Sequence, residues 1–171
     1  MRIYLTGYMG SGKSTLARKI AAQLGLAYID MDRYIENRFN RTVSAIFREE
    51  GELAFRRKER DCLLEISAIE DIIVATGGGA PCYFDNAEVM NASGFCVFLD
   101  VSARELALRL TRSRTIRPLV QQKRGVELLS YIEDTLEKRR PFYGKAQYHI
   151  TSDEITPEII IEKLGLDGSV R

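Results

Sequence analysis

The chain has 171 residues, 45% of them hydrophobic and 29% charged, which predicts one compact globular domain over residues 1–171 and leaves little room for a second. Its 25 Lys and Arg against 24 Asp and Glu leave a net charge of +1, which excludes an overall attraction to nucleic acid or anionic membranes. No run approaches the roughly 18 apolar residues that cross a bilayer, and the first residues lack a signal peptide's pattern, so we expect a cytoplasmic protein.

Short apolar runs alternate with segments of helical spacing. The runs, typical of strands buried on both faces, are residues 3–5, 27–29, 72–75, 95–99 and, more weakly, 148–150. Apolar residues with helical spacing lie between them, at 16–24, 53–69, 106–110 and 128–136. This alternation predicts an α/β fold, a three-layer sandwich in which helices flank a central five-stranded parallel sheet.

The sequence also indicates where helices end and where the alternation of strands and helices is interrupted. Gly25 suits the end of the first helix, Pro141 is predicted to stop a late one, and Thr156 with Pro157 predicts a helix start. Two stretches break the rhythm of strand and helix: a helical insertion over about 32–60, and a polar, basic segment over about 112–124. Three separated cysteines and a single histidine, His149, disfavour a disulfide framework and a Cys/His zinc site.

Residues 7–14, GYMGSGKS, satisfy the phosphate-binding pattern G-x-x-x-x-G-K-[ST] between a predicted strand and a predicted helix. Its glycines let successive N–H groups point at phosphate oxygens, and the helix N-terminus adds about half a positive charge. We therefore predict that ATP is held by Gly10, Ser11, Gly12, Lys13, Ser14 and Thr15. Lys13 would reach the β- and γ-phosphates, and the Ser14 hydroxyl would ligate Mg²⁺. A glycine-rich turn without a ligand is the alternative.

Asp30 and Asp32 follow the second predicted strand, at the sheet edge where ligands bind. One carboxylate there can hold Mg²⁺ through water, and another can accept the proton of an attacking hydroxyl. The alternative is that Asp32 only caps a helix over residues 33–38. The three glycines at 77–79 close the third strand and let backbone approach a ligand, unless they form a merely flexible turn.

Six short motifs follow one another along the chain. They are G-x-M-G-x-G-K-S-T at 7–15, D-x-D with I-E at 30–36, G-E-x-x-F-R-x-x-E at 51–59, T-G-G-G at 76–79, R-P-L at 117–119 and R-x-P-x-Y at 139–143. In this order they resemble the shikimate kinase family. Each motif is weak alone, whereas six in order over nearly the whole chain are specific.

The resemblance implies a P-loop kinase fold with a lid over about 112–124 and a substrate-binding subdomain in the insertion. It implies Mg²⁺-dependent transfer of the γ-phosphoryl group of ATP to the 3-hydroxyl of shikimate, on the route to chorismate and the aromatic amino acids. Shikimate carries one carboxylate and three hydroxyls, so its site needs a planar cation and an acceptor for a hydroxyl proton.

Carried over residue by residue, the resemblance implies that Asp32 holds the reacting hydroxyl and that Asp30 faces the water shell of Mg²⁺. Arg117, from the lid, would join Lys13 in stabilising the transferring phosphoryl group. Shikimate would be bound by Asp32, Arg56, Gly78, Gly79 and Arg139. Many members have an Arg that stacks on adenine where this chain has Leu110, so either Arg109 or Arg112 would substitute.

Three other functions are alternatives to a shikimate kinase. A gluconate or nucleoside monophosphate kinase would use the same phosphate loop, but the motifs after Glu52 favour shikimate. A regulatory nucleotide-binding module would not need Asp32 and Arg117. Nucleic acid binding by the basic segment 112–124 is disfavoured, because the segment lacks interleaved aromatics. No long apolar surface stripe is left over, so we expect a monomer.

Overall fold

Residues 1–113 and 123–167 are described by the computed structural model, and within them five strands form one parallel sheet in the order β2-β3-β1-β4-β5. The strands are β1 (Arg2–Thr6), β2 (Ala27–Asp30), β3 (Ile72–Ala75), β4 (Phe95–Asp100) and β5 (Tyr148–Thr151). The central strand β1 pairs with β3 on one side and β4 on the other, where Ile3 is in register with Ile73 and Phe95. The predicted α/β fold with a parallel five-stranded sheet is confirmed.

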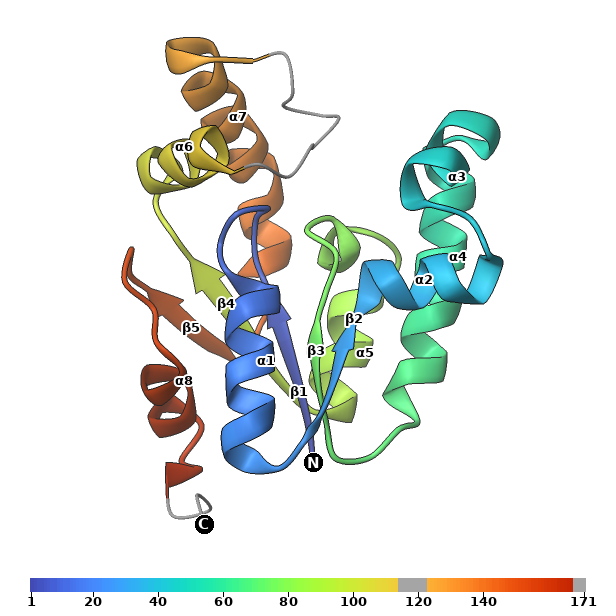
Figure 1. Cartoon of the computed structure of the whole chain (residues 1–171), viewed down its shortest axis with the longest axis vertical. Coiled ribbons are helices and arrows are strands. Elements are labelled where there is room, and N and C mark those ends of the chain that lie inside the picture. Colours follow the sequence, from blue (N-terminus) through green and yellow to red (C-terminus); the bar gives the residue numbers. More distant parts are fainter. Residues whose placement is uncertain (114–122, 168–171) are drawn as a thin grey trace.

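Helices connect the strands and cover both faces of the sheet (Figure 1). They are α1 (Lys13–Leu24), α2 (Met31–Phe39), α3 (Val43–Glu50), α4 (Glu52–Ser67), α5 (Asn86–Ser93), α6 (Ala103–Arg112), α7 (Gly125–Tyr143) and α8 (Pro157–Lys163), with a 3-10 turn, η1 (Ala80–Cys82). Helices α1 and α8 pack on one face, and α4 and α5 on the other. None of the helices in the described part of the chain is long and apolar enough to cross a membrane.

The strands alternate their side chains between the two layers of core. Ile3 and Leu5 of β1 pack with α1 and α8, whereas Tyr4 between them packs with α4 on the opposite face. All three side chains are buried. Burial on both faces explains why each strand is a continuous apolar run rather than an alternating one.

Two helix boundaries differ from the sequence-based prediction. Helix α2 begins at Met31, and its cap is Asp30, whose Oδ1 accepts a hydrogen bond from the Arg33 N–H at 3.3 Å. Asp32 is therefore not the cap but lies in the first turn. The prediction that Pro141 ends a helix was wrong, because α7 continues to Tyr143. Tyr143 is fully buried and stacks on Phe98 at 4.9 Å, which holds the last turn in place despite the missing N–H.

The predicted insertion corresponds to α2, α3 and the first half of α4, which pack through Ile35, Ile46 and Phe55. It rises beside the carboxyl ends of the strands, while α6 and the start of α7 rise on the other side of the phosphate loop (Figure 1). Of the predicted lid over about 112–124, residues 114–122 lie outside the described residues, and Arg117 is among them. The fold thus places the phosphate loop between two helical walls.

Candidate active site

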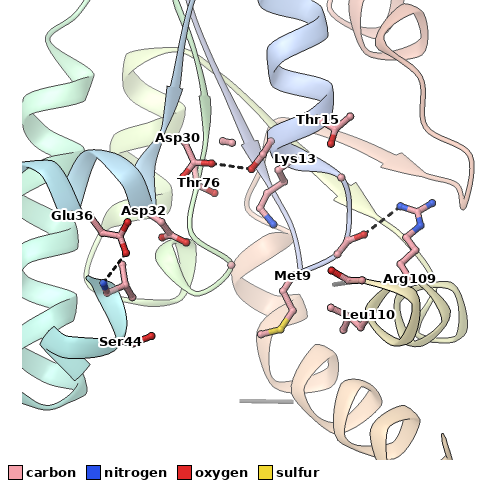
Figure 2. A pocket seen from close by; sticks show the side chains of 17 residues that line it. Met9, Lys13, Thr15, Asp30, Asp32, Glu36, Ser44, Thr76, Arg109 and Leu110 are labelled. Atoms are coloured by element: carbon pink, nitrogen blue, oxygen red, sulfur yellow. Dashed lines mark hydrogen bonds between the residues drawn. The ribbon is translucent and has the colours of Figure 1, made fainter. Parts of the chain in front are cut away.

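A cavity of about 670 Å³ lies at the carboxyl ends of β1, β2 and β3. Figure 2 shows Lys13 of the phosphate loop beside Asp30 and Asp32, with Glu36 on one wall and Arg109 on the other. The cavity brings together many of the sequence-predicted residues: Gly10, Gly12, Lys13, Ser14, Thr15, Asp30, Asp32 and Gly78. Nucleotide-binding and acceptor-binding candidates therefore share one space.

The phosphate loop, residues 7–14, closes around the Lys13 ammonium group. Nζ donates hydrogen bonds to the carbonyls of Gly7 at 2.8 Å and Tyr8 at 2.9 Å, and only 9% of Lys13 is exposed. Gly12, the N-cap of α1, has φ 95°, a left-handed conformation that favours glycine, and it has no side chain to occupy the N–H groups of the first turn. These N–H groups and one held cation make an anion site suited to phosphates. Ser11 is buried within the loop and lines a second cavity.

Ser14 and Asp30 form a pair of oxygen donors at the end of the loop. Ser14 Oγ donates to Asp30 Oδ2 at 3.0 Å, and the same oxygen accepts from the Tyr28 hydroxyl at 3.1 Å. A hydroxyl and a carboxylate beside a phosphate site fit Mg²⁺, which takes few protein ligands and completes its shell with water and phosphate oxygens. No cluster of three or more His, Cys, Asp or Glu suited to a metal occurs within residues 1–113 and 123–167.

Two carboxylates lie close to Gly77. A Cβ atom added there would lie 3.3 Å from Asp32 Oδ1 and 2.7 Å from Glu59 Oε1. Asp32 is exposed and lines the cavity, whereas Glu59 is fully buried. Burial raises the pKa of Glu59 from 4.5 to about 7, opposed by the nearby Arg56 guanidinium and reinforced by the Asp32 carboxylate. Glu59 was not predicted as a site residue. Its place three residues after Arg56, in the motif at 51–59, could have indicated that it contacts that arginine.

Arg56 from α4 and Arg139 from α7 meet at consecutive glycines. A Cβ atom at Gly79 would lie 2.5 Å from Arg56 Nη2, and one at Gly78 would lie 3.6 Å from Arg139 Nη1. Tyr143, one turn after Arg139, donates from its hydroxyl to the Gly78 carbonyl at 2.6 Å. The structure thus brings together the four residues that the resemblance implied for shikimate beside Asp32. It also explains the motif at 139–143, since a helix continued through proline carries both side chains to the same peptide.

Arg109 lies against the phosphate loop, with Nη1 3.4 Å from the Gly10 carbonyl and 3.5 Å from the Ser11 carbonyl. It lines the main cavity and also a second one of about 740 Å³, which Thr156 and Pro157 at the start of α8 line from the other side. Arg112 is exposed at the end of α6. The geometry therefore favours Arg109 over Arg112 near a nucleotide. The place of residues 155–158 beside the second cavity was not predicted, because that segment carries no sequence signal beyond a helix start.

A phosphate loop after the central strand of a parallel sheet, with carboxylates and a helical insertion at the same edge, defines a P-loop kinase. A family model described as shikimate kinase matches residues 9–166. The chain belongs to the shikimate kinase family, and the resemblance drawn from the six motifs is confirmed.

Relatives and solved structures agree with this assignment. The chain is 48% identical over 157 residues to a shikimate kinase of Parabacteroides distasonis, with 92% of this chain and 91% of the relative covered. The crystal structure of a Bacteroides thetaiotaomicron shikimate kinase matches at a TM-score of 0.93 and 44% identity, over 97% of this chain and 99% of the other. An Acinetobacter baumannii shikimate kinase in complex with shikimate matches at 0.85 and 32% identity, over 99% and 95%.

Proposed function

We propose that this protein transfers the γ-phosphoryl group of ATP to the 3-hydroxyl of shikimate, giving ADP and shikimate 3-phosphate on the route to chorismate and the aromatic amino acids. The observation that carries the proposal is the single cavity in which Lys13 and Ser14 lie beside Asp32 and Gly78. Family membership and the relative in complex with shikimate support the choice of acceptor.

On the donor side, the loop residues Gly10, Ser11, Gly12, Lys13, Ser14 and Thr15 bind the phosphates of ATP. Phosphoryl transfer depends mainly on positioning and on charges that meet the equatorial oxygens, and a lysine held inside the loop supplies one such charge. Ser14 and Asp30 would hold Mg²⁺, which when bound neutralises charge on the β- and γ-phosphates. Arg117 of the lid adds a further cation, and Arg109 contacts the adenine side of the nucleotide.

On the acceptor side, Asp32 binds the 3-hydroxyl and accepts its proton as the bond to phosphorus forms. Its exposure to the cavity lets a hydroxyl reach the carboxylate. Arg56 and Arg139 bind the shikimate carboxylate, and two planar guanidinium groups from different helices fix the ring from two directions. Gly78 has no side chain, so the ring lies against its backbone, and Gly79 leaves the space in which the Arg56 guanidinium lies.

We further propose a single kinase domain over residues 1–171, with the substrate-binding insertion at about 32–60 and the lid at about 112–124, acting as a cytoplasmic monomer without nucleic acid or membrane partners. Large apolar side chains left exposed in the described part of the chain belong to different elements, such as Leu53 on α4, Leu108 on α6 and Ile159 on α8. This distribution supports a monomer.

The test is a coupled assay of ADP release that offers shikimate, gluconate and nucleoside monophosphates side by side. We expect Mg²⁺-dependent turnover with shikimate alone. Asp32→Asn should lower kcat by about 10²- to 10⁴-fold, the range of general-base catalysis, with ATP affinity within about twofold of the original. Asp61→Asn, an exposed aspartate on α4, is the matched control and should keep full activity. Turnover of gluconate but not shikimate would overturn the acceptor, and near-normal turnover by Asp32→Asn would remove Asp32 from its role.

A further inference from the structure

The Arg56 guanidinium is held by two carboxylates and by an aromatic ring. Nη1 donates to Glu59 Oε2 at 2.8 Å and Nη2 donates to Glu52 Oε1 at 3.1 Å. The ring of Tyr83 lies 4.3 Å from Arg56 Cζ, closer than the rings of Phe55 at 5.1 Å and Phe47 at 5.7 Å. Only 6% of Arg56 is exposed, so these groups fix its position.

Tyr83 is joined to this arrangement through its hydroxyl as well as its ring. The hydroxyl donates to Glu52 Oε1 at 2.8 Å, the same oxygen that accepts from Arg56 Nη2. This hydrogen bond is the largest influence that lowers the pKa of Glu52, ahead of the bond from Arg56, so the carboxylate stays charged. Tyr83, Glu52 and Arg56 therefore form a closed set of contacts at the edge of the site.

The backbone that carries Tyr83 is itself anchored. Tyr83 directly follows η1, the turn that begins after Gly79. The buried Asn86 donates to the Ala80 carbonyl at 2.8 Å, and Arg60 of α4 pairs with Asp85 at 2.7 Å. Because α4 carries both Arg56 and Arg60, the same helix fixes the guanidinium and the segment whose ring covers it.

Two carboxylates already occupy N–H donors of Arg56, and their charge disfavours the binding of an anionic substrate there. The Tyr83 ring attracts the cation without adding negative charge or using a donor, and its hydroxyl takes up part of the accepting capacity of Glu52. Nη1 and Nη2 each carry two N–H groups and each uses one of them for a glutamate, so a second N–H on each remains for a substrate.

We propose that Tyr83 is a positioning residue for shikimate, acting through Arg56: it holds the guanidinium against Gly79 so that the remaining N–H donors meet the substrate carboxylate. The inference rests on the proposed function, since it assumes that Arg56 binds the carboxylate. It adds a residue outside the six motifs. Loss of the ring should therefore weaken shikimate binding and leave ATP binding unchanged.

The test compares Tyr83→Phe and Tyr83→Leu with Tyr34→Leu as the matched control. Tyr34 also donates to a glutamate of α4, Glu65, at 3.0 Å, but its ring is not among those that lie over Arg56 in the described part of the chain. We expect the KM for shikimate to rise about tenfold in Tyr83→Leu and about threefold in Tyr83→Phe, which keeps the ring. The KM for ATP should stay within about twofold in both, and Tyr34→Leu should change neither KM.

A double-mutant cycle separates positioning from a structural role. In an Arg56→Lys background, Tyr83→Leu should change the shikimate dissociation constant by less than about twofold, because its route of action is gone. The proposal is overturned if the effects of Arg56→Lys and Tyr83→Leu on the shikimate dissociation constant multiply, or if Tyr83→Leu raises the KM values for shikimate and ATP equally. If Tyr83→Leu fails to fold, an unchanged shikimate KM in Tyr83→Phe overturns it. Wild-type protein is assayed first: without shikimate turnover both proposals fall, whereas turnover with unaffected Tyr83 variants removes only this one.

Discussion

Asp32 and Glu59 both lie close to Gly77, but Asp32 is exposed to the cavity and Glu59 is buried, so their roles differ. Asp32 lines the cavity, where a carboxylate can be reached by a hydroxyl group. Glu59 is enclosed, with Oε2 bonded to Arg56 and Oε1 lacking a partner within residues 1–113 and 123–167. Burying a carboxylate costs free energy even when one oxygen is paired. Glu59 therefore holds Arg56 in place at a cost to stability that depends on its protonation.

We expect Glu59→Gln to remove a pH-dependent loss of stability. Because the pKa of Glu59 is raised from 4.5 to about 7 by burial, the unfolded chain releases this proton first as the pH rises. The wild-type free energy of unfolding should thus fall between about pH 4.5 and pH 7, relative to the variant, by about 3 kcal/mol, since each pKa unit corresponds to about 1.4 kcal/mol. Urea denaturation of both proteins at pH 5, 6, 7 and 8 measures the difference.

The same substitution at Glu65, also on α4 but facing solvent, is the control. Glu65→Gln changes an exposed side chain and leaves Glu59 in place, so it should not remove the pH-dependent loss of stability. A constant difference from wild type for Glu59→Gln would contradict the assignment of the burial cost to Glu59.

Among the elements, the link from β3 to η1 brings together more of the site than any single helix does. Gly77 is approached by Asp32 and Glu59, Gly78 by the phosphate loop and Arg139, and Gly79 by Arg56. Because side chains from α2, α4 and α7 converge on three consecutive residues, a side chain added here disturbs groups proposed to bind the substrate. This distinguishes it from glycines that are needed for packing.

Gly79→Ala should weaken shikimate binding. Its Cβ would lie 2.5 Å from Arg56 Nη2, so the guanidinium must move by several tenths of an ångström. We expect the KM for shikimate to rise at least about tenfold. The free energy of unfolding should fall by about 1–3 kcal/mol, because the displaced guanidinium is buried and hydrogen-bonded to Glu52 and Glu59. Steady-state kinetics and urea denaturation measure the two effects.

Gly94→Ala is the comparison for a glycine needed only for packing. Its Cβ would lie 2.6 Å from the Arg2 carbonyl oxygen, and neighbouring strands cannot shift cheaply. This variant should lose about 1–3 kcal/mol of stability and keep its KM for shikimate. If Gly79→Ala loses stability and keeps its KM, the link serves packing rather than the substrate.

Local patterns made much of the fold and half of the site predictable, whereas contacts between distant segments were not. The phosphate loop and the Asp30–Asp32 pair lie directly after strands, and parallel strands necessarily bring their carboxyl ends to one edge. The prediction that Pro141 ends a helix was wrong because its missing N–H costs a single hydrogen bond, and the burial of Tyr143 outweighs that cost. Tyr83 had no periodic or motif signal, since its role depends on α4 packing beside η1, where its partner Glu52 lies 31 residues away in the chain.

At the scale of the whole molecule, the groups proposed for the two substrates alternate along the sequence but lie on different elements of the fold. The nucleotide groups lie on the loop, α1 and α6, whereas the shikimate groups lie on α2, α4 and α7. The two sets meet at the cavity, which Asp32 and Gly78 line together with the phosphate loop, but they have no side chain in common. Each ligand should therefore stabilise the native state through its own contacts, by mass action.

We expect a non-hydrolysable ATP analogue with Mg²⁺, and shikimate, each to raise the Tm by about 5–10 °C at about 100 times its dissociation constant. That excess corresponds to about 2.7 kcal/mol, and 1 kcal/mol shifts the Tm of a domain of this length by about 2–4 °C. Lys13→Met should abolish most of the nucleotide shift and keep the shikimate shift, and Arg139→Ala should do the reverse. Thermal unfolding of the three proteins with each ligand alone separates these outcomes, and loss of both shifts in either variant would contradict two independent sets of contacts.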